Sequence, residues 1–470
     1  MNEFRLLING RMTPGASSID VINPSTEEVV AACPTADTDQ LNQAVAAAKA
    51  AFPAWSKLPI RERGALINKL ADALEARTEE FARLLTSEQG KPLPMAMWEV
   101  GGTAGSLRYF ASLDLPEKVL KDDDDTKIVL QHAPLGVVAA ITPWNFPLIL
   151  LAIKVGPGLL AGNTMVCKPA PTTPLTTLLF GEVAAEILPP GVLNVIADNN
   201  DLGGALSSHP DVAKVAFTGS TATGKKVMQA AASHLKRLTL ELGGNDAAIL
   251  LDDVDPKEVA PKIFGGATMN SGQVCLAIKR VYAPESIYDE LCDELAKLAK
   301  DAVVGDGFEQ GTQMGPLQNK AQFEKVKGYL EDARRDGKII AGGEALDRPG
   351  YFIAPTIVRD IPNESRLVQE EQFGPVLPVM SYTNLQEAIA KANDSEYGLG
   401  GTVWTKDLQR GYEVASQILS GTVWVNKHLD LPNDVPFGGA KQSGIGVEYG
   451  QEGLEEFTQA KTVNMAKHAW

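Results

Sequence analysis

Two side chains in this sequence are suited to covalent chemistry on a carbonyl group. Glu241 opens the run ELGGN, and Cys275 closes the run NSGQVC. A thiolate is a strong nucleophile, and a carboxylate can serve as a general base for a thiol or for water. Glycines beside both residues are typical of turns in which the backbone approaches a bound molecule closely. The two residues therefore predict a nucleophile and a base in one site.

Each of these residues also has a purely structural interpretation. A buried cysteine often acts only as a small hydrophobic residue, and we expect this of Cys33, Cys167 and Cys292. Cys275 differs because the residues before it are polar and suit a turn rather than a core. Glu241 ends an apolar, strand-like segment, so its carboxylate is either paired structurally or functional. Burial there would raise its pKa and make it a usable general base.

A third candidate, Asn145, lies in the run PWNFP of residues 143–147. A preorganised amide that donates to a developing oxyanion contributes roughly 3 kcal/mol to catalysis. The two prolines would stiffen this loop. The alternative is an ordinary turn asparagine without a catalytic role.

The run FTGSTATG of residues 217–224 is a candidate for cofactor binding. It follows a predicted strand and leads into a helix, so its backbone N–H groups would face a pyrophosphate placed there. A strand–helix turn that binds nothing is the alternative. The dinucleotide fingerprint G-x-G-x-x-G is absent from the sequence.

We next consider the helices and strands that must position these residues. The first third of the chain is predicted to be helical. Residues 39–52 are rich in alanine, and apolar residues recur at helical spacing between Leu66 and Leu85, with Gly90 as the stop. From about residue 135, Val- and Ile-rich strands are expected to alternate with helices, at residues 136–141, 164–168, 192–197, 212–217 and 238–242. This alternation predicts a parallel, doubly wound sheet.

Ligands bind such sheets beyond the carboxyl ends of the strands. Residues 143–147, 168–171 and 218–224 come directly after three of the predicted strands. We therefore expect the ligand site at that edge of the sheet.

A second α/β region is predicted from about residue 244. Its expected strands lie at residues 247–251, near Ile339 and Ile357 and at 376–382, and its expected helices at 287–299, 385–392 and 411–418. The extended run 126–131, after four aspartates that suit a solvated turn, is interpreted as an arm leaving the first domain. Residues 460–465 alternate in polarity and are expected to add to a sheet, including one of another subunit.

Composition narrows the classes of function. Of the 470 residues, 44% are hydrophobic and 22% charged, which suits two or three folded domains. The formal charge of −16 argues against nucleic acid and anionic membranes as partners. The four cysteines form no C-x-x-C pair and the five histidines are scattered, so we expect free thiols and no metal site. No signal-peptide or membrane-spanning run is predicted, and a cytoplasmic location is expected.

Taken together, six sequence blocks resemble the aldehyde dehydrogenase superfamily, and the similarity covers nearly the whole chain. Each block alone is weak, but all six occur in the family's order and spacing: PWNFP at 143–147, FTGS at 217–220, ELGGN at 241–245, GQVC at 272–275, EQFGP at 371–375 and PFGG at 436–439. The resemblance implies an α/β protein with a variant Rossmann-type NAD(P)-binding domain, a second α/β catalytic domain and a β-arm for oligomerisation. The implied bounds are 1–111 and 135–243, 244–442, and 112–134 with 458–470. Homodimers or homotetramers are expected.

The resemblance also implies a mechanism for oxidising an aldehyde to a carboxylic acid with NAD(P)+. Cys275 would form a hemithioacetal and then a thioester, with the Asn145 amide and the Cys275 N–H holding the oxyanion. Glu241 would activate the water that hydrolyses the thioester, and Lys154 and Glu448 match a proton relay proposed in some members. The expected cofactor-binding residues are Trp144, Lys168, Gly219, Ser220, Gly224, Leu242, Glu371 and Phe373.

One position departs from the family pattern. Many NAD-preferring relatives carry a glutamate where this chain has Pro171, and that glutamate binds the adenosine ribose. Its loss removes one barrier to a 2′-phosphate, and Lys168 is expected to remain available to meet that phosphate. NAD is the expected cofactor, with NADP left open.

The expected substrate is an apolar, medium-sized aldehyde. This follows from aligned pocket positions that are mostly aliphatic: Phe146, Leu150, Ile153, Met269, Val274, Leu276, Leu431 and Phe437. A semialdehyde dehydrogenase of the same family, a cofactor-independent thiol esterase and a crystallin-like structural protein are the alternatives. A CoA-acylating enzyme is disfavoured because Glu241 is retained. The sequence leaves the natural aldehyde, its pathway and the choice between dimer and tetramer open.

Overall fold

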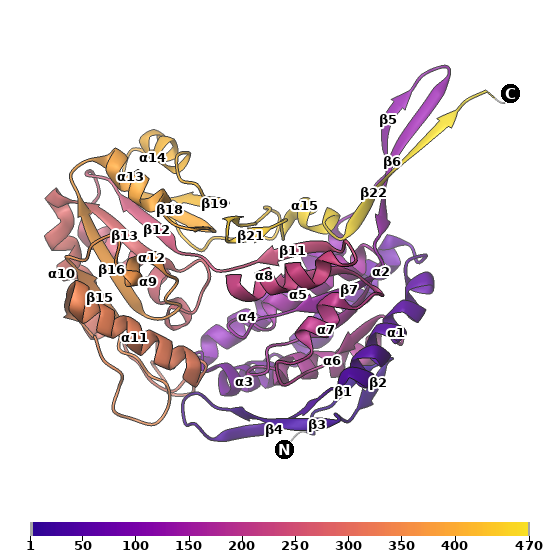
Figure 1. Cartoon of the computed structure of the whole chain (residues 1–470), viewed down its shortest axis with the longest axis horizontal. Helices are drawn as coiled ribbons and strands as arrows, with labels where there is room; N and C mark the ends of the chain where they lie inside the picture. The colour runs from indigo at the N-terminus through magenta and orange to yellow at the C-terminus, as the bar shows by residue number, and fades with distance from the viewer. Residues whose placement is uncertain (1–2, 469–470) are drawn as a thin grey trace.

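The computed structural model describes residues 3–468, so the ends of the predicted first domain (1–2) and of the predicted arm (469–470) lie outside the described residues. Figure 1 shows two α/β bodies side by side and a thin β-sheet arm that projects away from the first body. Within residues 3–468, no helix combines the length and apolar character that crossing a membrane requires.

The first body is built on an eight-stranded sheet whose five central strands are parallel. Its strands, in sheet order, are β2 (Arg11–Thr13), β1 (Leu6–Ile8), β9 (Leu193–Val195), β8 (Thr164–Lys168), β7 (Val137–Ile141), β10 (Val212–Thr218), β11 (Arg237–Glu241) and β21 (Gly444–Ile445). Its helices are α1 (Thr38–Trp55), α2 (Ile60–Ala76), α3 (Thr78–Gln89), α4 (Leu93–Ser112), α5 (Ile149–Leu160), α6 (Leu175–Ile187), α7 (Gly203–Ser208), α8 (Thr221–Ala232) and α15 (Gly450–Glu455). The predicted parallel sheet is confirmed.

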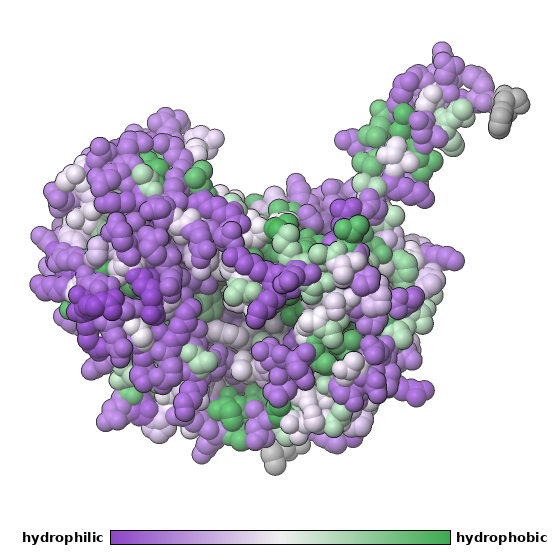
Figure 2. Space-filling view, in the orientation of Figure 1, coloured by the Kyte–Doolittle hydropathy of each residue, from purple (hydrophilic) through white to green (hydrophobic). Residues whose placement is uncertain are grey.

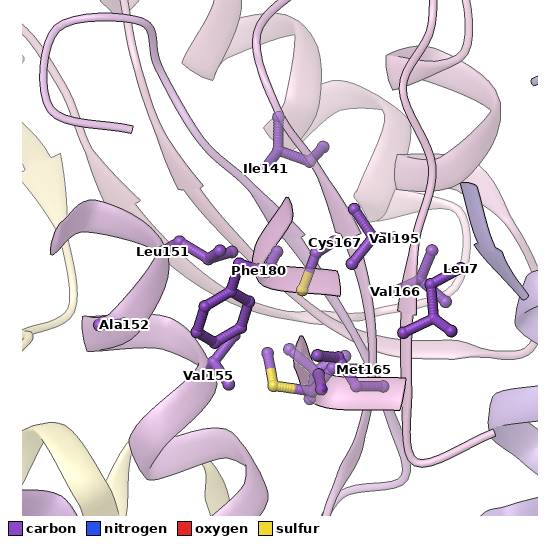
Figure 3. Packing of buried hydrophobic residues seen from close by; sticks show 14 of the residues in the cluster. Leu7, Ile141, Leu151, Ala152, Val155, Met165, Val166, Cys167, Phe180 and Val195 are labelled. Carbon is purple, nitrogen blue, oxygen red and sulfur yellow. The ribbon is translucent and has the colours of Figure 1, made fainter. Parts of the chain in front are cut away.

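The order β9-β8-β7-β10-β11 places the reversal of strand order between β7 and β10. Helices α5 and α6 connect β7, β8 and β9, whereas α7 and α8 lead to β10 and β11. Right-handed crossovers in opposite directions put these two pairs of helices on opposite faces of the sheet. Figure 3 shows the packing on one face, where the Cys167 sulfur lies near Phe180 and Val195. The expected packing role of Cys167 fits this position.

The prediction that the first third is helical is wrong for its first 35 residues. They form β1, β2 and the hairpin of β3 (Ser17–Ile22) and β4 (Val29–Thr35). Strands β1 and β2 are only three residues long, too short for a periodic pattern to reveal. The helical prediction holds from α1 onward, and α3 ends as expected at Gly90, whose φ of +93° suits glycine.

The second body is built on a seven-stranded sheet in which only β14 runs antiparallel to its neighbour. Its strands, in sheet order, are β14 (Lys338–Ala341), β15 (Thr356–Arg359), β16 (Val376–Tyr382), β13 (Ile278–Pro284), β12 (Asp246–Leu250), β18 (Gly400–Trp404) and β19 (Thr422–Val425). Its other elements are α9 (Pro256–Thr268), the short 3₁₀ turn η1 (Met269–Gly272), α10 (Glu285–Asp301), α11 (Lys320–Asp336), α12 (Arg366–Gln369), α13 (Leu385–Asn393), α14 (Leu408–Ala415) and the pair β17 (Tyr397–Gly398) and β20 (Ala440–Lys441). This confirms the predicted second α/β region.

The arm consists of β5 (Lys118–Asp122), β6 (Thr126–Pro134) and β22 (Thr458–Ala466), in the sheet order β22-β6-β5. The C-terminal strand, yellow in Figure 1, pairs with β6 of the same chain from Thr458 opposite Pro134 to Ala466 opposite Thr126. The extended run and the tail singled out in the sequence therefore form one small sheet.

Candidate active site

A cavity of about 550 Å³ lies beyond the carboxyl ends of β7, β8 and β10, where the strand order reverses. It is lined by the segments that follow these strands, residues 141–144, 168–172 and 217–220, together with residues of α7 and α8. Such a switch point is where doubly wound sheets bind dinucleotides. A Cβ built at Gly204, on the cavity wall, would have no atom within 4 Å, so the wall leaves room for a bulky group. The cavity, which we call the β7–β10 cavity, thus fits part of a dinucleotide.

A second cavity of about 170 Å³ is lined by Cys275 and Asn145, whereas Glu241 lines neither cavity, and we call the second one the thiol cavity. It is lined by residues from both bodies: Pro143, Trp144, Asn145, Leu150, Thr218, Gly219, Ser220, Leu242, Gly243, Cys275, Gln322, Lys325, Glu371 and Phe373. The two cavities share five lining residues: Pro143, Trp144, Thr218, Gly219 and Ser220. The sequence-predicted nucleophile and most of the predicted cofactor residues are therefore brought together.

Cys275 lies in a strained turn that enters β13. Within the preceding turn η1, Asn270 and Ser271 have φ values of 51° and 58°, and Gly272 has a φ of 76°. A Cβ at Gly272 would come within 2.4 Å of the Gly374 carbonyl oxygen, so only glycine fits there. Cys275 is half-buried, whereas Cys33, Cys167 and Cys292 are buried, so it is the one cysteine of the four that reaches a cavity.

Lys279, on β13, holds the same turn from its other side. Its buried ammonium donates hydrogen bonds to the carbonyl oxygens of Cys275 (2.6 Å) and Val274 (2.8 Å). Burial raises the pKa of the Cys275 thiol to about 12, Lys279 lowers it, and the carboxyl groups of Glu371 and Glu241 raise it further. The thiol is therefore protonated at neutral pH in this state and requires a base to react.

Hydrogen bonds hold Asn145 through its side-chain amide and through its backbone carbonyl oxygen. Its Nδ2 donates to the Gln273 carbonyl oxygen at 2.9 Å, beside the Cys275 turn. Its own carbonyl oxygen accepts from Lys91 Nζ at 2.9 Å and from Asn270 Nδ2 at 3.1 Å. An asparagine amide carries two N–H donors, and the bond to Gln273 uses one of them.

Glu241, at the end of β11, is buried with 4% of its surface exposed. Neither of its carboxylate oxygens has a hydrogen-bond partner within residues 3–468. Burial raises the pKa of this carboxyl group well above its usual range, Glu448 raises it further, and Lys154 opposes them. Lys154 Nζ in turn bonds Glu448 Oε1 (2.5 Å) and Thr218 Oγ1 (2.7 Å). Burial and Glu448 therefore favour the protonated form of Glu241, which must lose its proton before it can act as a general base.

Glu371 and Phe373 line the thiol cavity just before β16 begins. Glu371 Oε1 accepts the N–H of Gly244 at 2.9 Å, and the ring of Phe373 lies edge-on to Trp144 with centroids 5.3 Å apart. Phe373 has a φ of 51°, a backbone conformation that costs energy in a bulky residue.

Two residues of α11 that the sequence analysis missed support this segment. Gln322 Nε2 donates to the Phe373 carbonyl oxygen, and Lys325 Nζ to the Glu371 carbonyl oxygen, each at 2.9 Å. Both residues lie on a polar helix, where the sequence pattern does not distinguish them from solvent-exposed neighbours.

The structure changes the expectation for two predicted cofactor residues. Lys168, expected to stay available for a phosphate, forms an ion pair with Asp198 at 2.7 Å, because β8 and β9 end side by side. Gly224 lies inside α8 and lines neither cavity. A Cβ there would come within 2.4 Å of the Leu242 side chain, so this glycine lets α8 pack against Leu242.

The eight residues predicted to line a substrate pocket belong to one apolar cluster against which Cys275 packs, and of the eight only Leu150 lines the thiol cavity. Phe146, Ile153, Val274, Leu276 and Phe437 are buried in it, and Leu150, Met269 and Leu431 are partly buried. Trp98, on α4, is exposed and stands edge-on to Phe146 with ring centroids 6.4 Å apart. The sequence analysis did not single it out, since an isolated tryptophan in a helix carries no motif.

Comparison with known proteins gives consistent matches over the whole chain. The model of the aldehyde dehydrogenase family matches residues 12–463. Phenylacetaldehyde dehydrogenase of Pseudomonas fluorescens is 40% identical, over 98% of this chain and 96% of its own length. An NAD+ complex of aldehyde dehydrogenase from Bacillus cereus has a TM-score of 0.97 at 38% identity, covering 99% of this chain and 97% of that one. The structure of betaine aldehyde dehydrogenase from Staphylococcus aureus with NAD+ has a TM-score of 0.97 at 35% identity. The match covers 100% of this chain and 96% of that one.

Proposed function

Because this chain belongs to the aldehyde dehydrogenase family and is an NAD(P)-dependent aldehyde dehydrogenase, we propose that Cys275 carries its acyl intermediate. The observation that supports this most directly is the position of the Cys275 thiol. Of four cysteines it alone lines a cavity, and it does so beside Asn145 and the Glu371–Phe373 segment. The overall reaction converts an aldehyde, water and NAD+ into a carboxylic acid, NADH and a proton.

In the first step, the sulfur of Cys275 forms a bond to the aldehyde carbon as the thiol proton passes to a base. Glu241 is our candidate for that base, since its carboxyl group acts on the thiol electrostatically and its raised pKa makes the ionised form a stronger base. The carbonyl oxygen becomes an oxyanion, which the second N–H of the Asn145 amide can bind.

The cofactor, when bound, accepts the two electrons and the hydrogen that leave the substrate carbon. We propose that Lys168, Ser220 and Glu371, on the walls of the two cavities, hold it. The resulting thioester is an activated acyl group. Glu241 first releases to solvent the proton that it took from Cys275, which is the proton among the products. It then takes a proton from water as the hydroxide adds to the acyl carbon, and it returns that proton to the sulfur as the C–S bond breaks, which frees the acid and restores the thiol.

The substrate we propose is an apolar, medium-sized aldehyde. The cluster against which Cys275 packs is built from aliphatic and aromatic side chains, and Trp98 extends it through its contact with Phe146. The relatives include dehydrogenases of phenylacetaldehyde and of betaine aldehyde, so they do not decide the substrate of this chain. Burial of each additional methylene would favour binding by about 0.8 kcal/mol.

The test measures NADH formation over aldehydes of rising chain length with wild-type enzyme, Cys275→Ser and the control Cys292→Ala, which removes a buried thiol in α10. We expect Cys275→Ser to lose at least about 10³-fold in kcat, as loss of a nucleophile does, and Cys292→Ala to retain activity. Highest activity on succinic semialdehyde would contradict the apolar substrate. Ester hydrolysis by Cys275 without aldehyde oxidation would favour a thiol esterase instead.

A further inference from the structure

The ion pair between Lys168 and Asp198 lies at the wall of the β7–β10 cavity. Lys168 lines the cavity at the end of β8, with its Nζ 2.7 Å from Asp198 Oδ1. The side chains of Lys168 and Asp198 are 5% and 0% exposed. Asp198 Oδ2 accepts the N–H of Leu202 at 2.9 Å, just before α7, so both carboxylate oxygens are engaged. The carboxylate is therefore fixed beneath the cavity wall and cannot turn away from the lysine.

This pair changes the charge that a ligand meets in the cavity. NADP differs from NAD by a phosphate on the adenosine ribose, which adds nearly two negative charges. Pro171 supplies no carboxylate to reject that phosphate, so Lys168, if unpaired, would attract it. Asp198 cancels the lysine charge at a depth where water screens little. The other lysine on the wall, Lys226, is exposed, and water screens its attraction.

We infer that Asp198 is a specificity-determining residue: by neutralising Lys168, it takes over the discrimination against NADP that a carboxylate at position 171 would supply. This inference rests on the proposed placement of the dinucleotide in the β7–β10 cavity. It explains how a chain with Pro171 can remain an NAD enzyme.

The direct test is Asp198→Asn, studied by calorimetric titration of the full-length enzyme with NAD and with NADP, without aldehyde. The asparagine carbonyl can still accept the N–H of Leu202, but the amide no longer balances the lysine charge. We expect the Kd for NADP to fall about tenfold or more, since a charge-assisted hydrogen bond becomes available, while the Kd for NAD changes less than about threefold. An unchanged ratio of the two Kd values would overturn the inference.

A matched control and a second comparison accompany this variant. Asp211→Asn disrupts the Lys49–Asp211 pair, which is remote from both cavities and exposed, and should leave both Kd values unchanged. If Asp198→Asn does not fold, Lys168→Met is compared with Lys168→Met/Asp198→Asn. Because Asp198 acts through the lysine charge, its loss in that background should leave the ratio of the two Kd values unchanged, and a shift toward NADP there would overturn the inference.

Gly204→Phe separates failure of the inference from failure of the cofactor placement. Gly204 faces open space on the cavity wall, so the added ring would fill the cavity and weaken binding of both cofactors. If Gly204→Phe leaves both Kd values unchanged, the dinucleotide does not bind there and both proposals fall. If it weakens both while Asp198→Asn leaves their ratio unchanged, only the role of Asp198 is wrong.

Discussion

Glu241 is a buried carboxyl group whose ionisation affects both the stability of the fold and the proposed catalysis. Its carboxyl group has no hydrogen-bond partner within residues 3–468, and burial raises its pKa. The folded protein therefore holds this proton more tightly than the unfolded chain does. Consequently, as pH rises from the usual carboxyl range through the folded-state pKa, ionisation of Glu241 lowers the stability of the folded state. The same ionisation produces the base that the proposed mechanism needs.

Replacing Glu241 by glutamine should separate these two effects. We expect kcat to fall by about 10²–10⁴-fold, the usual contribution of a general base. Glutamine does not ionise, so it avoids the loss of stability that ionisation of Glu241 causes. The difference in melting temperature, variant minus wild type, should therefore be larger at pH 8 than at pH 5. Lys154 and Glu448 face the same group, so Glu448→Gln is measured alongside it. A variant with full turnover, or with the same stability difference at both pH values, would contradict this assignment.

At this scale the sequence singled out the residues that we propose as catalytic, but not the charged groups that surround them. Cys275, Glu241 and Asn145 stand out because their chemistry is unusual for their local patterns. Lys279 and Asp198 do not, since a charged residue in a short run is expected to face solvent. Their burial arises from the position of β13 between β12 and β16 and from β9 ending beside β8. Neither arrangement of neighbouring strands can be predicted from one segment of the sequence.

Among the elements, the loop that carries Asn145 depends on a buried ion pair between α4 and the segment before it. Lys91 and Glu99 are fully buried and bonded to each other. Glu99 Oε1 accepts the N–H groups of Leu148 (3.0 Å) and Ile149 (3.4 Å) at the start of α5. Lys91 donates to the Asn145 carbonyl oxygen at 2.9 Å. The pair thus fixes the loop at both of its ends.

Glu99→Gln should reveal how much the fold depends on this pair. Removing one partner leaves a buried charge uncompensated, so we expect the free energy of unfolding in urea to fall by about 3–5 kcal/mol. The control Glu79→Gln disrupts the exposed Arg83–Glu79 pair and should cost less than about 1 kcal/mol. The double variant Lys91→Met/Glu99→Leu should recover part of the loss. Equal effects of Glu99→Gln and Glu79→Gln would show that the buried pair is dispensable.

The elements themselves were predictable where a pattern was long or strongly apolar. The strands β7, β8 and β10 are buried along nearly their whole length, and the sequence located each of them within a residue or two. The strands β13 and β18 were missed because lysine, arginine and glycine interrupt their apolar runs. The interruptions have a structural cause, since a Cβ at Gly400 would meet the Asp246 carboxylate at 2.2 Å.

At the scale of the whole molecule, the site exists because two sheets face each other. Carboxyl ends of strands in the first body supply the cavity walls, and the turns that enter β13 and β16 of the second body supply Cys275 and Phe373. After the second body, the chain returns to the first as β21, which pairs with β11 beside Glu241. Sequence order alone predicted two α/β regions, but not this return, because β21 is only two residues long.

The arm has the features of a contact between copies of the chain. All five residues of β5 are exposed, with Val119 at 52% and Leu120 at 51%, and Met465 of β22 is 49% exposed. Figure 2 shows hydrophobic residues gathered on this projection, away from both bodies. The register of β5 on β6 shifts between Val119 and Lys121, so Leu120 stands at a bulge of this exposed strand. A projecting three-stranded sheet with free edges is seldom stable without a partner.

We therefore expect the variant Val119→Glu/Leu120→Glu to dissociate into monomers, as measured by sedimentation velocity. Burial of one such side chain contributes roughly 1.5–3 kcal/mol, and a twofold contact uses each side chain twice. The control Lys118→Glu/Lys121→Glu changes charge on the same strand but keeps its apolar residues, so it should dissociate less. Far-ultraviolet circular dichroism should be unchanged in both, since the arm lies outside the two cores. A wild-type chain that sediments as a monomer, or a glutamate variant with the wild-type mass, would exclude the arm as the contact between subunits.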